Sequence, residues 1–171
     1  METNGNLPFM PSRFEHRATF PAPVGTVHAT LVDEAFLTAR LRDIGGKGAA
    51  LLDHRTSDDG ADIRLRQGVD ARHLPGAVRS ILSGDLVVER EEHWRGREST
   101  GRATINGVPA EIRFASRLVP KGDGTEQVVD AEVKVGIPLI GGKIEKVVAE
   151  QVTKLLATEA EYAEKWLAEH A

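Results

Sequence analysis

The C-terminal stretch from Pro138 to Ala171 constrains the fold of this chain more than any other part of the sequence. After Gly142 it contains neither glycine nor proline, and its apolar residues recur every three or four positions, as on one face of an amphipathic helix. The apolar positions are Ile144, Val147, Val148, Val152, Leu155, Leu156, Tyr162, Ala163, Trp166 and Leu167. A helix of about 27 residues is about 40 Å long. Because no other stretch predicts a helix of that length, the rest of the chain must wrap around this one.

The composition is that of an ordinary globular protein and excludes several kinds of site. The chain has 171 residues, enough for one domain with a buried core, and 40% of them are hydrophobic. Its net charge of -4 argues against nucleic-acid binding, which requires a basic face. Because cysteine is absent, disulfides, thiol catalysis and cysteine-bound metals are excluded.

The N-terminal residues show no recognisable signal peptide, since Met1 to Asn6 are polar and no long apolar run follows them. No stretch elsewhere is apolar over the length that a membrane-spanning helix needs. We therefore predict a cytoplasmic protein without an integral membrane segment. Glycine and proline interrupt any regular pattern at the start, so residues 1–12 are expected to form a flexible leader before a single domain over residues 13–171.

The first part of that domain alternates between strand and helix signals. Apolar and polar residues alternate over residues 13–20, which predicts a strand. Pro21-Ala22-Pro23 ends this strand and opens a helix that extends to about Val32. A second short helical piece over residues 36–41 ends before Gly45-Gly46.

Strand patterns separated by turns fill the middle of the chain. Six further strands are predicted over residues 49–55, 63–69, 86–95, 103–105, 112–118 and 127–137. Asn106-Gly107 is the strongest hairpin signal, and residues 120–124 predict another turn. Hairpin-linked strands pair antiparallel, and their one-sided apolar pattern predicts a sheet with one face covered by helices. The fold class is therefore α+β.

Several local sequences resemble one known superfamily. They are Pro21-Ala22-Pro23-Val24, Leu74-Pro75, Gly84-Asp85-Leu86, Glu92-His93-Trp94 and the stretch from Pro138 to Glu145. From about Arg13 onward, the chain resembles the START-like superfamily, the helix-grip fold of polyketide cyclases and plant pollen-allergen proteins. It is most similar to the branch known as domain of unknown function 2505. The resemblance implies a seven-stranded antiparallel sheet curved around the C-terminal helix, with a hydrophobic pocket between them. Since the superfamily includes lipid carriers, cyclases and hydrolases, the fold does not select one function.

Strand alternation and helix spacing indicate which side chains face the space between sheet and helix. The apolar candidates are Ile63, Leu65, Val88, Trp94, Ile105, Ile112, Phe114, Ala131, Val133, Val148, Val152, Leu155 and Tyr162. The polar candidates, which would orient a ligand, are Gln67, Arg90, Glu92 and Glu159. The same pattern is compatible with a closely packed core. We favour an open cavity, largely because of the resemblance.

Arg90 and Glu92 admit two interpretations. If they lie inside, Arg90 must neutralise a buried glutamate, because an unpaired buried charge is very costly. Alternatively, they lie where the strand leaves the core and form a solvated pair that contributes little. We favour the solvated pair.

Other kinds of site have weaker support. None of the histidines shows the spacing of a metal site, and no serine lies in a Gly-x-Ser-x-Gly sequence. Gly45-Gly46-Lys47-Gly48 lacks the spacing of a phosphate-binding loop and predicts a turn. We therefore predict no catalytic residue, no metal and no cofactor.

Three functions fit these observations. The favoured one is a non-enzymatic carrier or sensor of a small hydrophobic molecule, such as a lipid, polyketide or isoprenoid. The alternative is a cyclase or hydrolase in which Glu92 or Glu159 acts as a general acid or base, with its pKa raised by burial. A further alternative is a protein-interaction domain that binds no ligand, which a filled core would favour.

Overall fold

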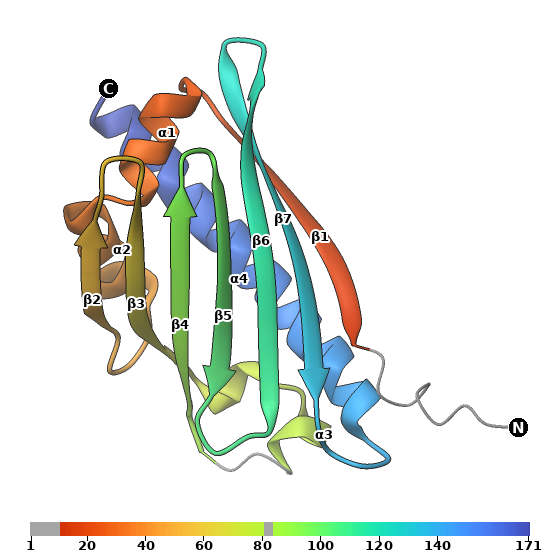
Figure 1. Ribbon diagram of the computed structural model, residues 1–171. Helices are drawn as coiled ribbons and strands as arrows, with labels where there is room; N and C mark the ends of the chain where they lie inside the picture. The colour runs from red at the N-terminus through yellow and green to blue at the C-terminus, as the bar shows by residue number, and fades with distance from the viewer. Residues whose placement is uncertain (1–10, 81–83) are drawn as a thin grey trace, which may run out of the picture.

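The computed structural model describes residues 11–80 and 84–171, so the leader predicted over residues 1–12 falls mostly outside the described part (Figure 1). Ser12 already belongs to the first strand. The elements are β1 (Ser12–Phe20), α1 (Val24–Leu31), α2 (Glu34–Ile44), β2 (Ala50–Thr56), β3 (Gly60–Val69), the 3-10 turn η2 (Ala71–His73), α3 (Gly76–Arg79), β4 (Leu86–Arg95), β5 (Glu98–Ile105), β6 (Ala110–Lys121), β7 (Gly124–Val135) and α4 (Gly141–Glu169).

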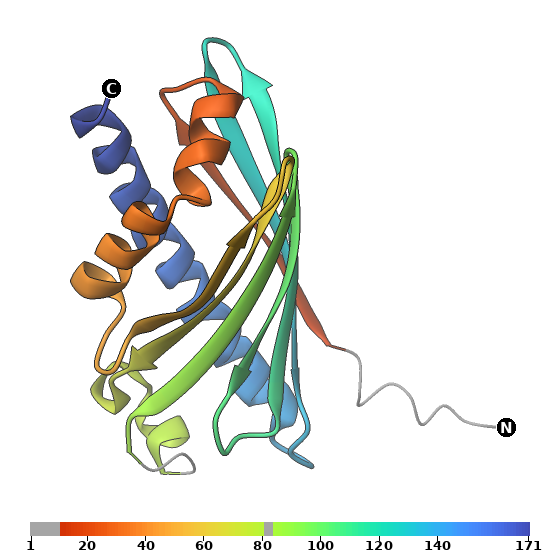
Figure 2. The same cartoon turned by 60° about the vertical axis from the view of Figure 1, so that its left-hand side comes forward.

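The strands form one antiparallel sheet in the order β1-β7-β6-β5-β4-β3-β2. The sheet curves, and α4 runs along its concave face (Figures 1 and 2). β1 and β2 form the two edges of the sheet, and α1 and α2 connect them at one end of the molecule. This arrangement confirms the predicted α+β helix-grip fold.

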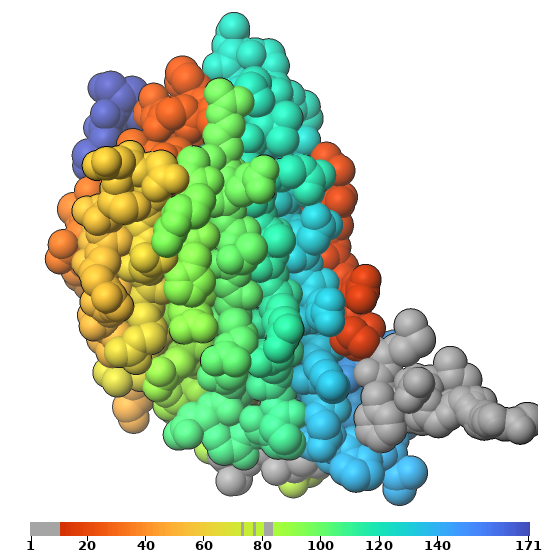
Figure 3. Space-filling view, in the orientation of Figure 1, coloured from red at the N-terminus to blue at the C-terminus, as the bar shows by residue number. Residues whose placement is uncertain are grey.

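The far face of the sheet, which is turned toward the viewer in Figure 3, carries the charged residues of the alternating pattern. Arg64 and Glu89 form an ion pair of 3.5 Å there, and both side chains are about half exposed. His93 lies on the same face, where its Nδ1 is 2.8 Å from Asp62. The strands are therefore amphipathic, with apolar side chains turned toward α4.

Of the strands that are longer than the sequence pattern predicts, β5 and β6 differ most from it. β5 begins at Glu98 rather than near Ala103, because its first residues pair with β4 despite a glycine at position 101. β6 continues through Pro120, which the sequence placed in a turn. Glu98, the first residue of β5, pairs with Arg117, so β5 does not reach as far as Pro120. Beyond Arg117, β6 is paired with β7 and not with β5. A proline is tolerated there because no strand on the other side needs its missing N–H.

The start of α4 is fixed by one buried carboxylate. Glu145 accepts a hydrogen bond from the backbone N–H of Val135 (2.9 Å) and another from the Ser12 hydroxyl (3.2 Å). Just before the helix, Leu139 has a φ of 71° and is fully exposed. A left-handed conformation is unfavourable for a residue with a Cβ, so this loop holds strain without burying the side chain.

The apolar interior is divided into two clusters. The first lies beneath α1 and α2 and includes Phe36, Leu65 and Trp94. The second surrounds the start of α4 and includes Ile112 and Ile144. Among the described residues, no helix is long and apolar enough to cross a lipid bilayer.

Candidate functional site

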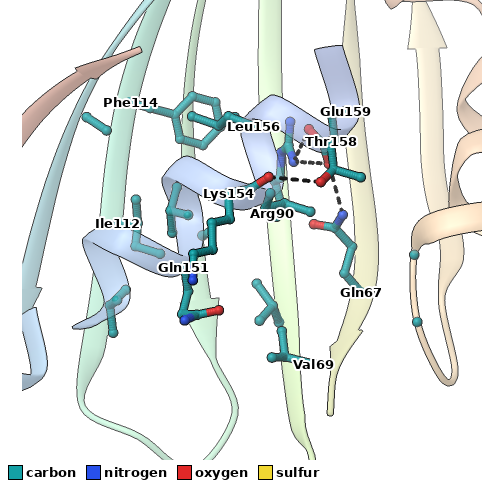
Figure 4. A pocket seen from close by; sticks show the side chains of 18 of the residues that line it. Gln67, Val69, Arg90, Ile112, Phe114, Gln151, Lys154, Leu156, Thr158 and Glu159 are labelled. Carbon is teal, nitrogen blue, oxygen red and sulfur yellow. Dashed lines mark hydrogen bonds and ion pairs between the residues drawn. The ribbon is translucent and has the colours of Figure 1, made fainter. Parts of the chain in front are cut away.

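A cavity of about 950 Å³ lies between the concave face of the sheet and α4. β1, β3 to β7 and the helices α1 to α4 contribute to its wall. Lys47, Asp85 and Lys154 line it and are exposed, so the cavity opens between the α2–β2 connection, the start of β4 and α4. Figure 4 shows the wall near the middle of α4. The space predicted from the sequence is open rather than filled by side chains.

Most of the candidate residues lie on the cavity wall. These are Gln67, Val88, Arg90, Glu92, Trp94, Ile105, Ile112, Phe114, Ala131, Val148, Val152, Leu155 and Glu159. Contact of these residues with a ligand stays a prediction.

Four candidates lie elsewhere in the structure. Ile63 and Leu65 face the same side of the sheet, but they are buried in the cluster beneath α1 and α2. Val133 is fully buried in the cluster at the start of α4. Tyr162 turns toward α2, where its hydroxyl donates to Asp43 at 2.6 Å. Strand parity and helix spacing identified the correct face in the first three cases, but not which part of that face other side chains cover.

Glu159 of α4 is the centre of a buried polar network. Nη1 of Arg90 donates to both Glu159 carboxylate oxygens, at 3.1 and 3.0 Å, and Nε2 of Gln67 donates to Oε2 at 3.1 Å (Figure 4). A second guanidinium, that of Arg40 in α2, lies 3.7 Å from the same carboxylate. α4, β3, β4 and α2 are therefore joined at one point.

Glu92 extends this network along β4. Its carboxylate accepts from Nε of Arg90 at 2.7 Å and from Nε1 of Trp94 at 3.2 Å. The side chains of Arg90 and Glu92 are only 12% and 9% exposed. The solvated pair that we favoured from the sequence is therefore wrong: the two residues form an interior ion pair, because the helix covers this part of β4.

The formal charges of the network balance. Two arginines, Arg40 and Arg90, face two glutamates, Glu92 and Glu159. Burial raises the pKa of Glu159, but the charges of Arg40 and Arg90 and the hydrogen bonds outweigh it and hold that pKa below its usual range. Burial likewise opposes ionisation of Arg90, yet the two carboxylates raise its pKa. The pKa of Glu159 is thus lowered, whereas the enzyme alternative expected Glu92 or Glu159 to be a general acid or base with a raised pKa.

A glycine positions the arginine. The ring of Phe114 lies directly on Gly101 of the neighbouring strand, where any Cβ would collide with it. The guanidinium carbon of Arg90 is 5.7 Å from the centroid of that ring, within the range of a cation–π contact. Gly101 therefore makes room for the aromatic surface on which Arg90 rests.

A second polar group on the wall is uncharged, and sequence analysis missed it. The hydroxyls of Ser99 and Ser116 are 2.7 Å apart, and Nε2 of Gln127 is 3.5 Å from Ser116. His16 also lines the cavity, and burial lowers the pKa of its imidazole. Ser116 lies two residues after Phe114 in β6 and therefore on the same face of the sheet, so strand alternation could have identified it. No sequence pattern indicated Arg40.

Nothing in the described part of the chain resembles a metal centre: residues 11–80 and 84–171 contain no group of three His, Asp or Glu side chains that could hold an ion. Nε and Nη2 of Arg40 are buried and have no hydrogen-bond partner within those residues. In the interior of the cavity, the polar side chains thus include one charged network and one set of neutral groups, whereas Lys47, Asp85 and Lys154 lie exposed at its opening.

Comparisons with known proteins agree with this geometry. The sequence profile of a family described as protein of unknown function (DUF2505) matches residues 15–167. The uncharacterized protein Rv0481c of Mycobacterium tuberculosis is 29% identical over 170 residues, which cover 92% of this chain and 98% of that protein.

Solved structures share the fold at low sequence identity. TTHA0849 from Thermus thermophilus has a TM-score of 0.67 at 16% identity and covers 94% of this chain and 99% of its own. A START superfamily protein from Mycobacterium smegmatis has a TM-score of 0.58 at 17% identity, covering 93% and 99%. The Zhui aromatase/cyclase from Streptomyces has a TM-score of 0.57 at 16% identity, covering 88% and 94%. At these identities the likeness concerns the fold alone.

Proposed function

This chain belongs to the DUF2505 family of proteins of unknown function, and from its START-like fold we propose that it binds one small hydrophobic molecule between the sheet and α4. We propose further that residues 13–171 act as a single ligand-binding domain. The observation that carries the proposal is an open cavity of about 950 Å³. Its size lies within the range of about 300–1,000 Å³ that is typical of small-molecule sites.

The wall of the cavity supports an apolar ligand. Aliphatic and aromatic side chains such as Val88, Ile105 and Phe114 supply most of its surface. A ligand that buries about 300 Å² of apolar surface gains about 7.5 kcal/mol at about 25 cal/mol per Å². Association costs several kcal/mol against this gain, so apolar burial alone supports affinities no tighter than about micromolar.

The two alternatives fit the geometry less well. The cyclase or hydrolase considered above uses Glu92 or Glu159 as a general acid or base with a raised pKa, whereas Arg40 and Arg90 lower the pKa of Glu159. A protein-interaction domain without a ligand needs no internal space. We therefore assign the charged network a structural role, in which it fixes α4 to the sheet at one side of the cavity.

Binding of N-phenyl-1-naphthylamine, a neutral apolar dye, tests the proposal directly. We expect its fluorescence to rise on binding with a micromolar Kd. Val152→Trp places a large side chain in the cavity and should weaken binding at least tenfold, whereas Ala157→Trp on the exposed side of α4 should leave the Kd unchanged.

Native mass spectrometry of protein purified from its own host provides a second test. A co-purified small-molecule mass that is lost in the Val152→Trp variant is the expected result. If the folded protein neither binds the dye nor carries such a mass, the proposed function is wrong.

A further inference from the structure

The neutral polar group on the cavity wall contains one more hydroxyl hydrogen than its own contacts use. Ser99 and Ser116 each carry one O–H, and the 2.7 Å contact between their oxygens uses a single hydrogen, whichever of them donates. Gln127 adds a donor to Ser116 rather than an acceptor. Within residues 11–80 and 84–171, no other side-chain hydrogen bond involves either serine. One O–H therefore remains without an acceptor in the described part of the chain.

Both serines are buried and border the cavity, so the unused donor has consequences for what binds there. They are 4% and 7% exposed, and both line the space beneath α4. A buried hydroxyl without an acceptor is unfavourable, and a ligand oxygen that accepts its hydrogen removes that penalty. Resting on the function proposed above, we infer that the cavity selects a neutral apolar molecule with an oxygen acceptor, such as a ketone, positioned against Ser99 and Ser116.

The surroundings of the serine pair favour a neutral ligand over an acid. Of the charged side chains that line the cavity, Arg40, Arg90, Glu92 and Glu159 belong to the network whose charges balance. Two nitrogens of Arg40 have no partner in the described residues, but Glu159 neutralises its charge. Lys47, Asp85 and Lys154 lie exposed at the opening of the cavity. A ligand carboxylate placed against the serines would thus lack a counter-ion of its own in the interior, which is costly.

The row of the sheet that contains the serines is also uncharged. Strand pairing aligns Trp94, Ser99, Ser116, Val129 and His16 across five strands. The pKa of His16 is lowered by burial, so its imidazole is neutral near pH 7. A hydrogen-bonding oxygen placed on this row therefore meets only neutral donors and acceptors.

Three probes of matched shape test the inference: fluorene, 9-fluorenone and fluorene-9-carboxylate, each measured by displacement of N-phenyl-1-naphthylamine. We expect the ketone to bind about two- to tenfold more tightly than the hydrocarbon, the factor that one neutral hydrogen bond provides, and the carboxylate to bind most weakly. The double variant Ser99→Ala/Ser116→Ala should lose the preference for the ketone while keeping its affinity for fluorene. The control Ser57→Ala, on an exposed turn, should keep both.

The infrared carbonyl stretch of bound 9-fluorenone gives a readout that does not depend on the variant folding. In the wild-type protein it should lie at lower frequency than in an alkane solvent. An alkane-like frequency, equal affinities for ketone and hydrocarbon, or tightest binding of the carboxylate would each overturn the inference and leave the proposed function intact. If none of the probes binds to the folded protein, both fail.

Discussion

Replacing Arg90 with methionine tests whether the network around Glu159 is a buried, charge-balanced unit. The substitution keeps much of the apolar stem and removes the guanidinium that bonds to both Glu92 and Glu159. The network then holds one arginine and two carboxylates, and its net charge changes from zero to -1. Removing one partner of a buried ion pair typically costs about 3–5 kcal/mol.

Urea unfolding measures this cost. With a slope of about 2 kcal/mol per M, the expected loss corresponds to a fall in the midpoint of about 1.5–2.5 M. Arg64→Met is the matched control: Arg64 is half exposed on the neighbouring strand and pairs with Glu89 at 3.5 Å, so its loss should cost less than about 1 kcal/mol.

The double variant Arg90→Met/Glu92→Met separates charge imbalance from lost packing. It leaves Arg40 and Glu159, which pair with each other at 3.7 Å, so it should be more stable than Arg90→Met alone by at least about 1 kcal/mol. Additive losses in the double variant, or a loss below about 1 kcal/mol for Arg90→Met, would show that the network does not act as a buried unit.

Three further predictions concern pH and backbone strain. The pKa of Glu159 in the folded state lies below its ordinary value of 4.5, so the ionised carboxylate stabilises the fold above pH 4.5, and this contribution is lost as the pH falls through the folded-state pKa. Glu159→Gln should therefore lose less stability in acid than the wild-type protein does. An equal loss in the two proteins would contradict this prediction. Tyr162 is the only tyrosine, and burial together with its hydrogen bond to Asp43 raises its pKa to about 12. Titration of the tyrosine absorbance should show this value, and Asp43→Asn should lower it. An unchanged midpoint in the variant would show that the hydrogen bond to Asp43 does not form. Leu139→Gly should raise the thermal unfolding midpoint slightly, because it relieves about 1–2 kcal/mol of strain in the left-handed backbone and costs only about 0.5–1 kcal/mol in chain entropy. A lower midpoint would mean that the exposed leucine side chain stabilises the fold.

The order of elements could be predicted from the sequence because each follows from local periodicity. The apolar repeat after Gly142 and the turn at Asn106-Gly107 both lie where the sequence placed them. Strand lengths were harder to predict from the sequence. β6 can extend through Pro120 because β5 begins opposite Arg117, and this depends on how the two strands pair rather than on the sequence of either one.

The candidate site could be predicted only in part, because its burial depends on how distant elements pack together. Parity identified which side of β4 carries Arg90 and Glu92, but their burial depends on how far α4 reaches along the sheet. Arg40 comes from α2, which is far from α4 in the sequence, and no spacing rule relates it to Glu159. Ser99 and Ser116 are short polar residues on strands, which a search for charged or aromatic groups passes over.

The order of strands in the sheet has a consequence for how the protein is made. β1, near the start of the chain, pairs only with β7, near its end, and the long helix follows β7. Contacts between distant parts of a chain form slowly, because a large loop must close before they form. During synthesis, the sheet lacks one edge and its concave face lacks a cover until β7 and α4 have been made. Binding of the ligand that we propose would therefore have to wait until α4 has folded against the sheet, and the apolar face that is exposed before then favours aggregation.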